Sequence, residues 1–503
     1  MTAPTPVTSI DAAADAVADK LGAEVVDVPR ELADRIAESG AAVLTEDEAR
    51  ADAARDWWPL AIDWATEGAV PQRPALIARP TSTTQVSAIL AACNESAVPV
   101  TAMAGRSGVC GGSIPVHGGI SLDMTTLSGV ATVDETSLTA DVRAGTFGPD
   151  LEDALGSTGA GYTLGHWPQS IDLSTVGGWL ACRGAGQYST RYGKIEDMVV
   201  GLEVVLADGR VVRTEGHGPR AATGPNLTQL FVGSEGTLGI VTEARLRIHP
   251  RPSARETRAF GFPTFAAGLE ACRRILRRGA TPAVLRLYDQ TESGRNFEQP
   301  DTNLLIVLDE ADPAVLAGTM AVVDQECGTQ GGGRTLDPKL VDRWLGHRND
   351  VSQLAPLWRG GIVVDTAEIS APWAVLPALF DDVISALNAI DGTLAASAHQ
   401  SHGYTDGACL YFTFGGRGPK GDAAWRERYY RQAWDVVTEA TLAHGAAISH
   451  HHGIGLNRSR FLPRALGSSF DVLKALKMTL DPAGILNPGK FGFPSRYGTA
   501  PWS

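Results

Sequence analysis

The stretch "GSEGTLGIVTEARLRI", residues 233–248, joins a loop of glycines and small polar residues to a strand with alternating apolar residues. Two loops of the same kind come earlier in the chain, "MAGRSGVCGG" at residues 103–112 and "GHWPQSIDLSTVGGWLACRGAG" at residues 165–186. Glycine allows a backbone to come close to a ligand and to aim its N–H groups at an anion. Three such loops exceed what turns alone require, and they suit an extended dinucleotide that crosses a domain.

The first loop, taken by itself, fits a plain glycine-rich turn better than a ligand site. Its spacing is not the G-x-G-x-x-G of a Rossmann fold, and no Gly-Lys-Ser/Thr follows it as in a P-loop. The interpretation as a dinucleotide site therefore depends on the three loops together.

The composition limits the kind of protein. The 503 residues allow two to four domains of about 150 residues each. Hydrophobic residues make up 44% and charged residues 20%, as in a globular chain. The net charge of −14 argues against nucleic acid and anionic membranes as partners. Six scattered cysteines without a CxxC pair indicate reduced thiols. Neither a signal peptide nor a membrane span is expected, so we expect a cytoplasmic protein.

The pattern of residues along the chain predicts an α+β fold. Residues 1–70 read as helices, such as "IDAAADAVADKLG" and "PRELADRIAESG". In residues 71–252 we expect a helix near residues 85–93, a strand near residues 98–102, and two hairpins, "GVATVDETSLTADVRAG" and "MVVGLEVVLADGRVVRTE". The second hairpin turns at Asp208-Gly209, a common hairpin pair.

Beyond residue 252 the glycines become fewer. In residues 253–440 strands such as "NLLIVLD" alternate with amphipathic helices such as "WAVLPALFDDVISALNAI" and "YYRQAWDVVTEATLAHG". We expect a second α+β domain there, followed by a closing segment at residues 441–503.

The motifs "STVGGW", "YGKIEDMVVGLEVV" and "GSEGTLGIVTEA" together resemble the FAD-binding domain of the vanillyl-alcohol oxidase/p-cresol methylhydroxylase (PCMH) superfamily. The resemblance covers about residues 70–490. It implies a PCMH-type FAD-binding domain at residues 71–252 and a substrate cap domain on an antiparallel sheet at residues 253–440. An N-terminal helical segment, residues 1–70, would precede them, and residues 441–503 would close on the FAD domain.

The resemblance also implies which residues hold FAD. The first loop would hold the pyrophosphate, the second the middle of the cofactor, and the third its far end. The positions are Ala102, Met103, Ala104, Gly105, Arg106, Ser107, Gly108, Gln169, Ser170, Asp172, Ser174, Thr175, Gly178, Arg183, Gly184, Glu235, Gly236, Gly239 and Ile240. Some relatives attach the flavin to a histidine in the first loop; Arg106 aligns there, so we expect non-covalent FAD.

The three histidines in the run "ISHHHGIG", residues 448–455, allow three interpretations. As metal ligands the histidines are poorly spaced, because in extended backbone only His450 and His452 would share a direction, and structural zinc sites need wider spacing. They could also be solvated or packed side chains. The third reading is acid–base work, for which imidazole is suited by its pKa near ~6.5. Crowding would keep at least one ring neutral. We expect no metal.

The stretch "HQSHGYTDGACLYFTF", residues 399–414, places Tyr411 in an alternating strand. Periodicity alone favours strand packing for this tyrosine. However, "YTDGACLYF", "ISHHHGIGLNRSRFL", "VLRLYDQ" and "EISAPW" resemble the alkylglycerone-phosphate synthase branch of the superfamily. That resemblance implies five catalytic-site residues: Tyr411, His450, His451, His452 and Arg286.

One position departs from that branch. Members of the branch have an arginine before the "SAPW" motif, and that arginine aligns with Leu354-Ala355 here. Neither Arg348 nor Arg359 aligns with it. The departure favours an FAD-dependent oxidoreductase, in which a histidine or Tyr411 deprotonates the hydroxyl of an alcohol or 2-hydroxy acid and hydride passes to flavin N5.

Two alternatives and several partners complete the expectations. One alternative is a synthase that exchanges an acyl for an alkyl chain on acyl-dihydroxyacetone phosphate without net redox change. The other is a non-catalytic FAD-binding protein. The expected partners are a small-molecule substrate, which a lipid-like compound would fit, and an electron acceptor that the sequence does not identify. Dimers are frequent in the superfamily, so a homodimer is also expected.

Overall fold

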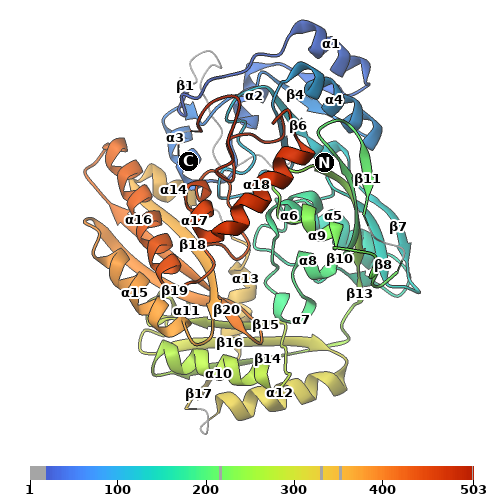
Figure 1. The fold of residues 1–503 in the computed structure, drawn as a ribbon. Helices are drawn as coiled ribbons and strands as arrows, with labels where there is room; N and C mark the ends of the chain where they lie inside the picture. The colour runs from blue at the N-terminus through green and yellow to red at the C-terminus, as the bar shows by residue number, and fades with distance from the viewer. Residues whose placement is uncertain (1–17, 215–217, 329–331, 351–353, 501, 503) are drawn as a thin grey trace.

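The computed structural model describes residues 18–214, 218–328, 332–350, 354–500 and 502 (Figure 1). Helices and sheets are combined in an α+β fold, as the sequence predicts. No helix in these ranges is long and apolar enough to cross a membrane.

A four-stranded sheet positions the first glycine-rich loop. Its strand order is β2-β4-β6-β5, in which β4, β6 and β5 run parallel. The loop leaves the end of β5. The predicted helix α4 begins after Ser82, whose side chain accepts a hydrogen bond from Gln85 N. The bounds are β2 (Ala42–Leu44), β4 (Leu76–Arg79), α4 (Thr83–Ser96), β5 (Val100–Met103) and β6 (Ile120–Asp123).

A five-stranded antiparallel sheet contains both predicted hairpins. Its order is β11-β10-β12-β8-β7, and β12 starts directly after the third glycine-rich loop. Gly209 turns between β10 and β11 with φ +83°, a conformation that favours glycine. The bounds are β7 (Val130–Asp134), β8 (Thr139–Arg143), β10 (Val199–Val205), β11 (Val211–Arg213) and β12 (Ile240–Arg247).

Short helices and small strands lie along the chain between the strands of the five-stranded sheet, and β13 follows its last strand. The second glycine-rich loop enters α6, whose N-cap is Thr175. The bounds are α5 (Gly148–Gly156), β9 (Tyr162–Thr163), α6 (Val176–Cys182), α7 (Ser189–Tyr192), α8 (Ile195–Met198), α9 (Leu227–Phe231) and β13 (His249–Pro250).

A seven-stranded sheet forms the other half of the molecule. Its order is β17-β14-β16-β15-β19-β20-β18, and every neighbouring pair is antiparallel. The bounds are β14 (Ala254–Phe262), β15 (Val284–Tyr288), β16 (Asn303–Ala311), β17 (Arg334–Leu336), β18 (Ile362–Pro372), β19 (Thr393–Gly403) and β20 (Gly407–Arg417).

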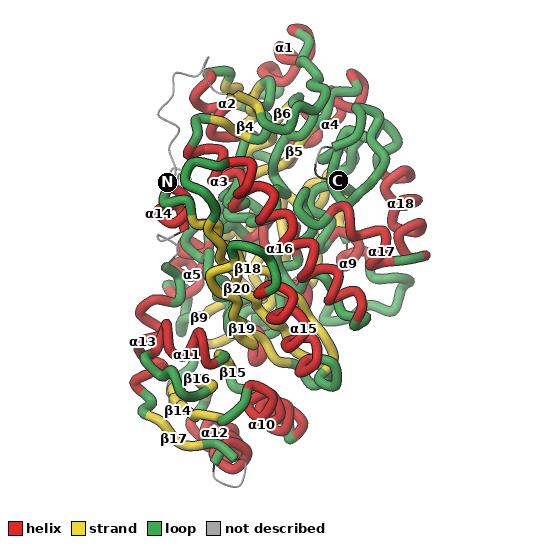
Figure 2. The backbone as a smooth tube through the Cα atoms, turned by 90° about the vertical axis from the view of Figure 1, so that its left-hand side faces the viewer, coloured by secondary structure: helices red, strands yellow, loops and turns green. Residues whose placement is uncertain are grey.

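Helices α10, α12, α15 and α16 pack against one face of this sheet, whereas α11 and α13 pack against the other face. The long helices α15 and α16 lie over β18, β19 and β20 (Figure 2), where Phe412 and Phe414 join their core. Because side chains alternate along a strand, Tyr411, the residue before Phe412, points to the opposite face. The bounds are α10 (Phe265–Arg277), α11 (Gln290–Phe297), α12 (Pro313–Cys327), α13 (Lys339–His347), α14 (Leu354–Arg359), α15 (Leu376–Asn388) and α16 (Ala423–Ala443).

The N-terminal part differs from the sequence prediction in one place. Residues 10–17 of the expected first helix lie outside the described residues, and its continuation is the strand β1 (Ala18–Asp19), which pairs with β3 (Ala69–Val70). The helix prediction is wrong there because main-chain pairing with a distant strand replaces local helical bonds. The second expected helix is α1 (Arg30–Glu38), followed by α2 (Asp47–Ala53) and α3 (Pro59–Thr66).

The C-terminal segment returns to the sheets that carry the glycine-rich loops. Main-chain hydrogen bonds join Val100 N to Ile485 O and Asn487 N to Val100 O, both at 2.8 Å. The Lys477 ammonium donates to Thr237 O at 2.9 Å. Helix α18 (Ser468–Leu480) lies across this side of the molecule, after α17 (Leu462–Leu466) (Figure 1).

Candidate active site

A cavity of about 310 Å³ lies where the glycine-rich loops meet the seven-stranded sheet. Seventeen of the cofactor positions implied by the sequence line it: Ala102, Met103, Ala104, Gly105, Arg106, Ser107, Gly108, Gln169, Ser170, Ser174, Thr175, Gly178, Gly184, Glu235, Gly236, Gly239 and Ile240. The structure does not bring the other two side chains to the cavity. Asp172 is exposed, and Arg183, whose αL backbone ends α6, lies 3.4 Å from Glu196.

Glycines are needed where the loops contact each other. A Cβ atom on Gly105 would lie 1.9 Å from the carbonyl oxygen of Leu173 in the second loop. A Cβ atom on Gly177 would lie 2.8 Å from the Ala144 Cβ atom. Both distances are too short for a side chain. The contact between the first two loops therefore depends on Gly105, and the contact of the second loop with the chain just after β8 depends on Gly177.

Several polar atoms on the cavity wall have no hydrogen-bond partner among the described residues. They are Asp56 Oδ2, Ser113 Oγ, both ring nitrogens of His166, Gln187 Oε1, Ser401 Oγ and His452 Nδ1. Buried polar atoms are normally hydrogen-bonded, so these atoms are suited to a ligand that carries many donors and acceptors. FAD is such a ligand, with ring N–H and carbonyl groups, ribityl hydroxyls and phosphates.

Sequence reasoning missed part of this wall. Asp56, Trp57, His166 and Gln187 line the cavity but lie outside the positions that the motifs implied. His166 lies within the second glycine-rich loop, so its position in that loop could have indicated that it lines the cavity. Asp56 and Trp57 belong to the N-terminal segment, where no local pattern points to a cavity.

The histidine turn is organised by the buried carboxylate of Glu368 on β18. This carboxylate accepts hydrogen bonds from Ser449 Oγ at 3.0 Å, from His452 N at 2.8 Å and from His450 N. It also lies 3.1 Å from Arg458 Nη2, and both side chains of this ion pair are fully buried. Burial opposes ionisation, but Arg458 and the histidines hold the Glu368 pKa far below its usual range. The carboxylate is therefore charged and fixes the turn.

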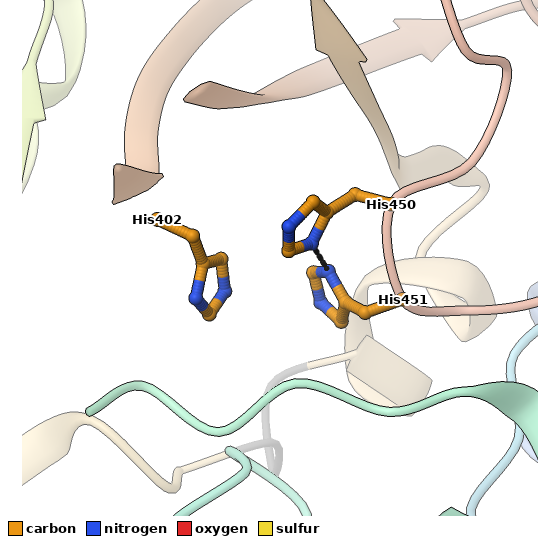
Figure 3. A group of neighbouring side chains, drawn as sticks. All are labelled: His402, His450 and His451. Carbon is orange, nitrogen blue, oxygen red and sulfur yellow. Dashed lines mark hydrogen bonds between the residues drawn. The ribbon is translucent and has the colours of Figure 1, made fainter. Parts of the chain in front are cut away.

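The turn is bent, which changes where the rings point. Ala447 pairs with Ser370 of β18, and the chain then turns away at Gly453, with φ +79°. The Nδ1 atoms of His450 and His451 approach to 2.8 Å (Figure 3). The expectation that only His450 and His452 share a direction is thus wrong, because it assumed extended backbone.

His402 of β19 faces the same pair of rings (Figure 3). The rings of His402 and His450 stack with centroids 4.9 Å apart, and one ligand atom from each of His402, His450 and His451 lies within 4.8 Å of the others. Two hydroxyls hold the outer nitrogens: Ser189 Oγ is 2.7 Å from His402 Nδ1, and Tyr404 OH is 2.8 Å from His450 Nε2. Such a group can relay protons; the absence of a metal stays a prediction.

Tyr411 and His452 form a hydrogen-bonded pair on the cavity wall. The Tyr411 hydroxyl lies 3.0 Å from His452 Nε2, and His452 Nδ1 lies 3.4 Å from Glu368 Oε1. Burial lowers the pKa of His452 to about 4 and raises the pKa of the Tyr411 phenol. At neutral pH the imidazole is therefore uncharged and able to accept a proton.

Arg286 of β15 is positioned beside this pair by a buried chain of contacts. Its guanidinium donates to Tyr288 OH at 2.8 Å and to His399 Nε2 at 2.6 Å, while Nδ1 of the same imidazole lies 2.8 Å from Glu292 Oε2. The His399 ring stacks on the Tyr411 ring with centroids 5.0 Å apart. The structure thus brings Arg286, Tyr411, His451 and His452 to the cavity wall, and His450 directly behind them.

Arg348 lies closer to this region than the sequence alignment indicated. Its guanidinium stands over the rings of Tyr188, Trp344 and Trp167, at 5.1, 5.5 and 5.9 Å from the centroids. Arg348 O accepts a hydrogen bond from Gln187, a cavity residue. Arg359, by contrast, is exposed at the end of α14.

Comparison with known proteins identifies the family. A model described as "FAD binding domain" matches residues 74–215, and one described as "FAD linked oxidases, C-terminal domain" matches residues 251–491. An uncharacterised FAD-linked oxidoreductase of Escherichia coli is 30% identical over 433 residues, covering 83% of this chain and 88% of the relative. The chain belongs to the FAD-linked oxidase family. FAD is therefore its cofactor, as predicted.

Two other relatives of this chain carry different names. An alkyldihydroxyacetonephosphate synthase of Dictyostelium discoideum is 31% identical over 459 residues, covering 84% of this chain and 74% of the relative. A glycolate oxidase subunit of Bacillus subtilis is 30% identical over 432 residues, covering 83% and 88%.

Solved structures confirm the PCMH-type fold of this chain. A structure of alkyldihydroxyacetonephosphate synthase superposes with a TM-score of 0.76 at 26% identity, over 97% of this chain and 89% of that one. A structure of p-cresol methylhydroxylase superposes with a TM-score of 0.74 at 17% identity, over 94% and 99%. The resemblance to the superfamily, including the synthase branch, is confirmed.

Proposed function

We propose that this FAD-binding protein oxidises a hydroxylated small molecule, an alcohol or a 2-hydroxy acid. The observation that carries the proposal is the hydrogen-bonded pair of Tyr411 and His452 on the wall of the cofactor cavity, 3.0 Å apart. Removing hydrogen from an alcohol requires a group that takes the hydroxyl proton while a hydride leaves the carbon. Bound FAD supplies the hydride acceptor.

In this proposal the Tyr411 oxygen takes the proton of the substrate hydroxyl. Because burial keeps the phenol protonated, Tyr411 passes its own proton to His452 Nε2 in the same movement. The imidazole becomes positively charged, and the Glu368 carboxylate, 3.4 Å from its Nδ1 atom, stabilises that charge. Arg286 lines the same space and orients an oxygen of the substrate through its remaining N–H groups.

We further propose that FAD is held without a covalent bond. Arg106 occupies the loop position where some relatives carry the attaching histidine, and its guanidinium is bound to Asp52, 2.6 Å from Oδ2. Acid precipitation of the yellow protein tests this: we expect a colourless pellet and free FAD in the supernatant. Colour that stays with the pellet would contradict the proposal. The domain boundaries and a homodimer also stay predictions.

A second candidate is the synthase reaction, in which an alkyl chain replaces an acyl chain on acyl-dihydroxyacetone phosphate. The likeness to proteins of that name supports it, at 31% identity in sequence and a TM-score of 0.76 in structure. Arg348, beside the cavity residue Gln187, offers a guanidinium that suits a phosphate.

One anaerobic experiment separates the two. The purified protein is titrated with short and long alcohols, 2-hydroxy acids and acyl-dihydroxyacetone phosphate while the flavin absorbance is recorded and the products are analysed. For the oxidase proposal we expect a hydroxylated compound to bleach the flavin and to lose two hydrogens. If only the acyl phosphate perturbs the flavin, and a fatty alcohol then yields an ether, the synthase candidate replaces it.

A further inference from the structure

Asp56 is a buried acid of the N-terminal segment with one carboxylate oxygen unused by the protein. Its side chain is 1% exposed and lies between α2 and α3. Oδ1 accepts a hydrogen bond from Trp58 N at 3.0 Å, which closes a tight turn. Oδ2 has no partner among the described residues. The turn uses only the Oδ1 atom, so it does not explain why this position carries a carboxylate with a second oxygen, Oδ2.

The unused oxygen faces the cofactor cavity. Asp56 is part of the cavity wall, and a Cβ atom on Gly108 of the first glycine-rich loop would lie 3.6 Å from Oδ2. Main-chain bonds fix this position, because Trp57 N donates to Gly108 O at 2.9 Å and to Arg106 O at 3.2 Å. The ion pair between Asp52 and Arg106 ties the same segment to the same loop.

The nearby cation Lys490 does not take up this oxygen. Its ammonium group donates instead to Ile114 O at 2.6 Å and to Asn487 Oδ1 at 3.2 Å. Burial raises the pKa of Asp56 to about 7, and the main-chain N–H groups of Trp58 and Ser113 and the charge of Lys490 lower it only in part. A buried carboxyl oxygen without a partner is costly, and a donor on a bound ligand would remove that cost.

We infer that Asp56 is a cofactor-binding residue, and that its Oδ2 atom pairs with a hydrogen-bond donor of FAD. FAD offers such donors in the N–H group of its ring system and in its hydroxyls. The N-terminal segment is thus part of the cofactor site, although the matched FAD-binding model begins only at residue 74. The inference concerns FAD retention and holds for either candidate reaction.

The test uses Asp56→Ser, since a serine hydroxyl can still accept the bond from Trp58 N but has no counterpart of Oδ2. Asp63→Ser is the matched control. Asp63 lies in the same segment, is also 1% exposed and also has an unpartnered Oδ2, but it binds Arg426 at 2.8 Å and does not line the cavity. The FAD content of each purified protein, the Kd for FAD after reconstitution, and the visible spectrum are measured.

At a pH above the pKa of the Asp56 carboxyl, we expect Asp56→Ser to raise the Kd for FAD roughly 10- to 100-fold, as for loss of a hydrogen bond to a charged group. Asp63→Ser should lower the unfolding temperature and leave the Kd within about twofold. An unchanged Kd and spectrum in Asp56→Ser would overturn the inference, and so would an equal loss of FAD in Asp63→Ser. If Asp56→Ser does not fold, Asp56→Asn replaces it in the test, because an amide keeps the shape and removes the charge. A Kd for FAD equal to that of the wild type in Asp56→Asn would then overturn the inference.

Discussion

Replacing Glu368 by glutamine should destabilise the protein strongly and disorder the histidine turn. The carboxylate accepts hydrogen bonds from Ser449 and from two main-chain N–H groups, those of His450 and His452, and it neutralises Arg458. An amide keeps the shape, but it is uncharged and turns an NH₂ group toward donors that need an acceptor.

The size of the effect follows from burial. Both side chains of the Glu368–Arg458 pair are fully buried, so the substitution leaves an uncompensated cation out of contact with water. Breaking such a pair costs about 3–5 kcal/mol. The matched control is Glu439→Gln, which breaks the Glu439–Arg464 pair at 2.6 Å with half-exposed side chains. An exposed pair contributes at most about 1 kcal/mol.

Denaturant unfolding of the FAD-loaded proteins, followed by flavin fluorescence and by circular dichroism, measures both effects. We expect a large decrease in the free energy of unfolding for Glu368→Gln and little change for Glu439→Gln. The reasoning is refuted if the two variants lose equal stability, or if Glu368→Gln loses less than about 1 kcal/mol.

Three further predictions concern the phenol, an imidazole and a glycine. Tyr411→Phe should slow flavin reduction by the substrate roughly 10²- to 10⁴-fold and leave the affinity for FAD unchanged. Stopped-flow absorbance measures the rate of flavin reduction. The control Tyr429→Phe, remote from the cavity, should react like the wild type. Burial lowers the pKa of His166 to about 3. The unfolded chain therefore binds the proton more readily between that value and the usual pKa near ~6.5, and stability falls as the pH decreases through this window. Between about pH 7 and about pH 5 this one group lowers the free energy of unfolding by about 2 kcal/mol. When the free energy of unfolding is measured at the two pH values, His166→Phe should therefore lose about 2 kcal/mol less than the wild type. Gly105→Ala places a methyl group 1.9 Å from a backbone oxygen and should reduce FAD content severely, whereas Gly318→Ala, with open space around it, should not. Full FAD content in Gly105→Ala would contradict the account of the loops.

The fold could be read from the sequence where local patterns determine it. The Asp208-Gly209 turn, the capped helix after Ser82 and the alternating strand that contains Tyr411 all depend on neighbours along the chain, and the structure contains each of them. The first strand could not be predicted, because Ala18 pairs with Ala69, and no local pattern records a partner so far away.

The candidate site was predictable only in part, for the same reason. The glycine-rich loops can be recognised in the sequence by their composition, and Tyr411 and the histidines could be named from the resemblance to the synthase branch. Asp56 and Gln187 reach the cavity through tertiary packing alone. The meeting of the His450 and His451 rings follows from a bend that Glu368 imposes from another strand, so no rule for residue spacing could have given it.

The pairing of Ala447 with Ser370 has a consequence for how the protein moves. Two main-chain hydrogen bonds, of 2.9 and 3.1 Å, attach the start of the histidine turn to β18 as if it were a short extra strand. Amide hydrogens here should exchange with deuterated solvent at the rate of the sheet interior, far more slowly than those of an ordinary surface loop. The histidines of this turn then become exposed only when the sheet itself opens, so their geometry lasts as long as the native sheet does.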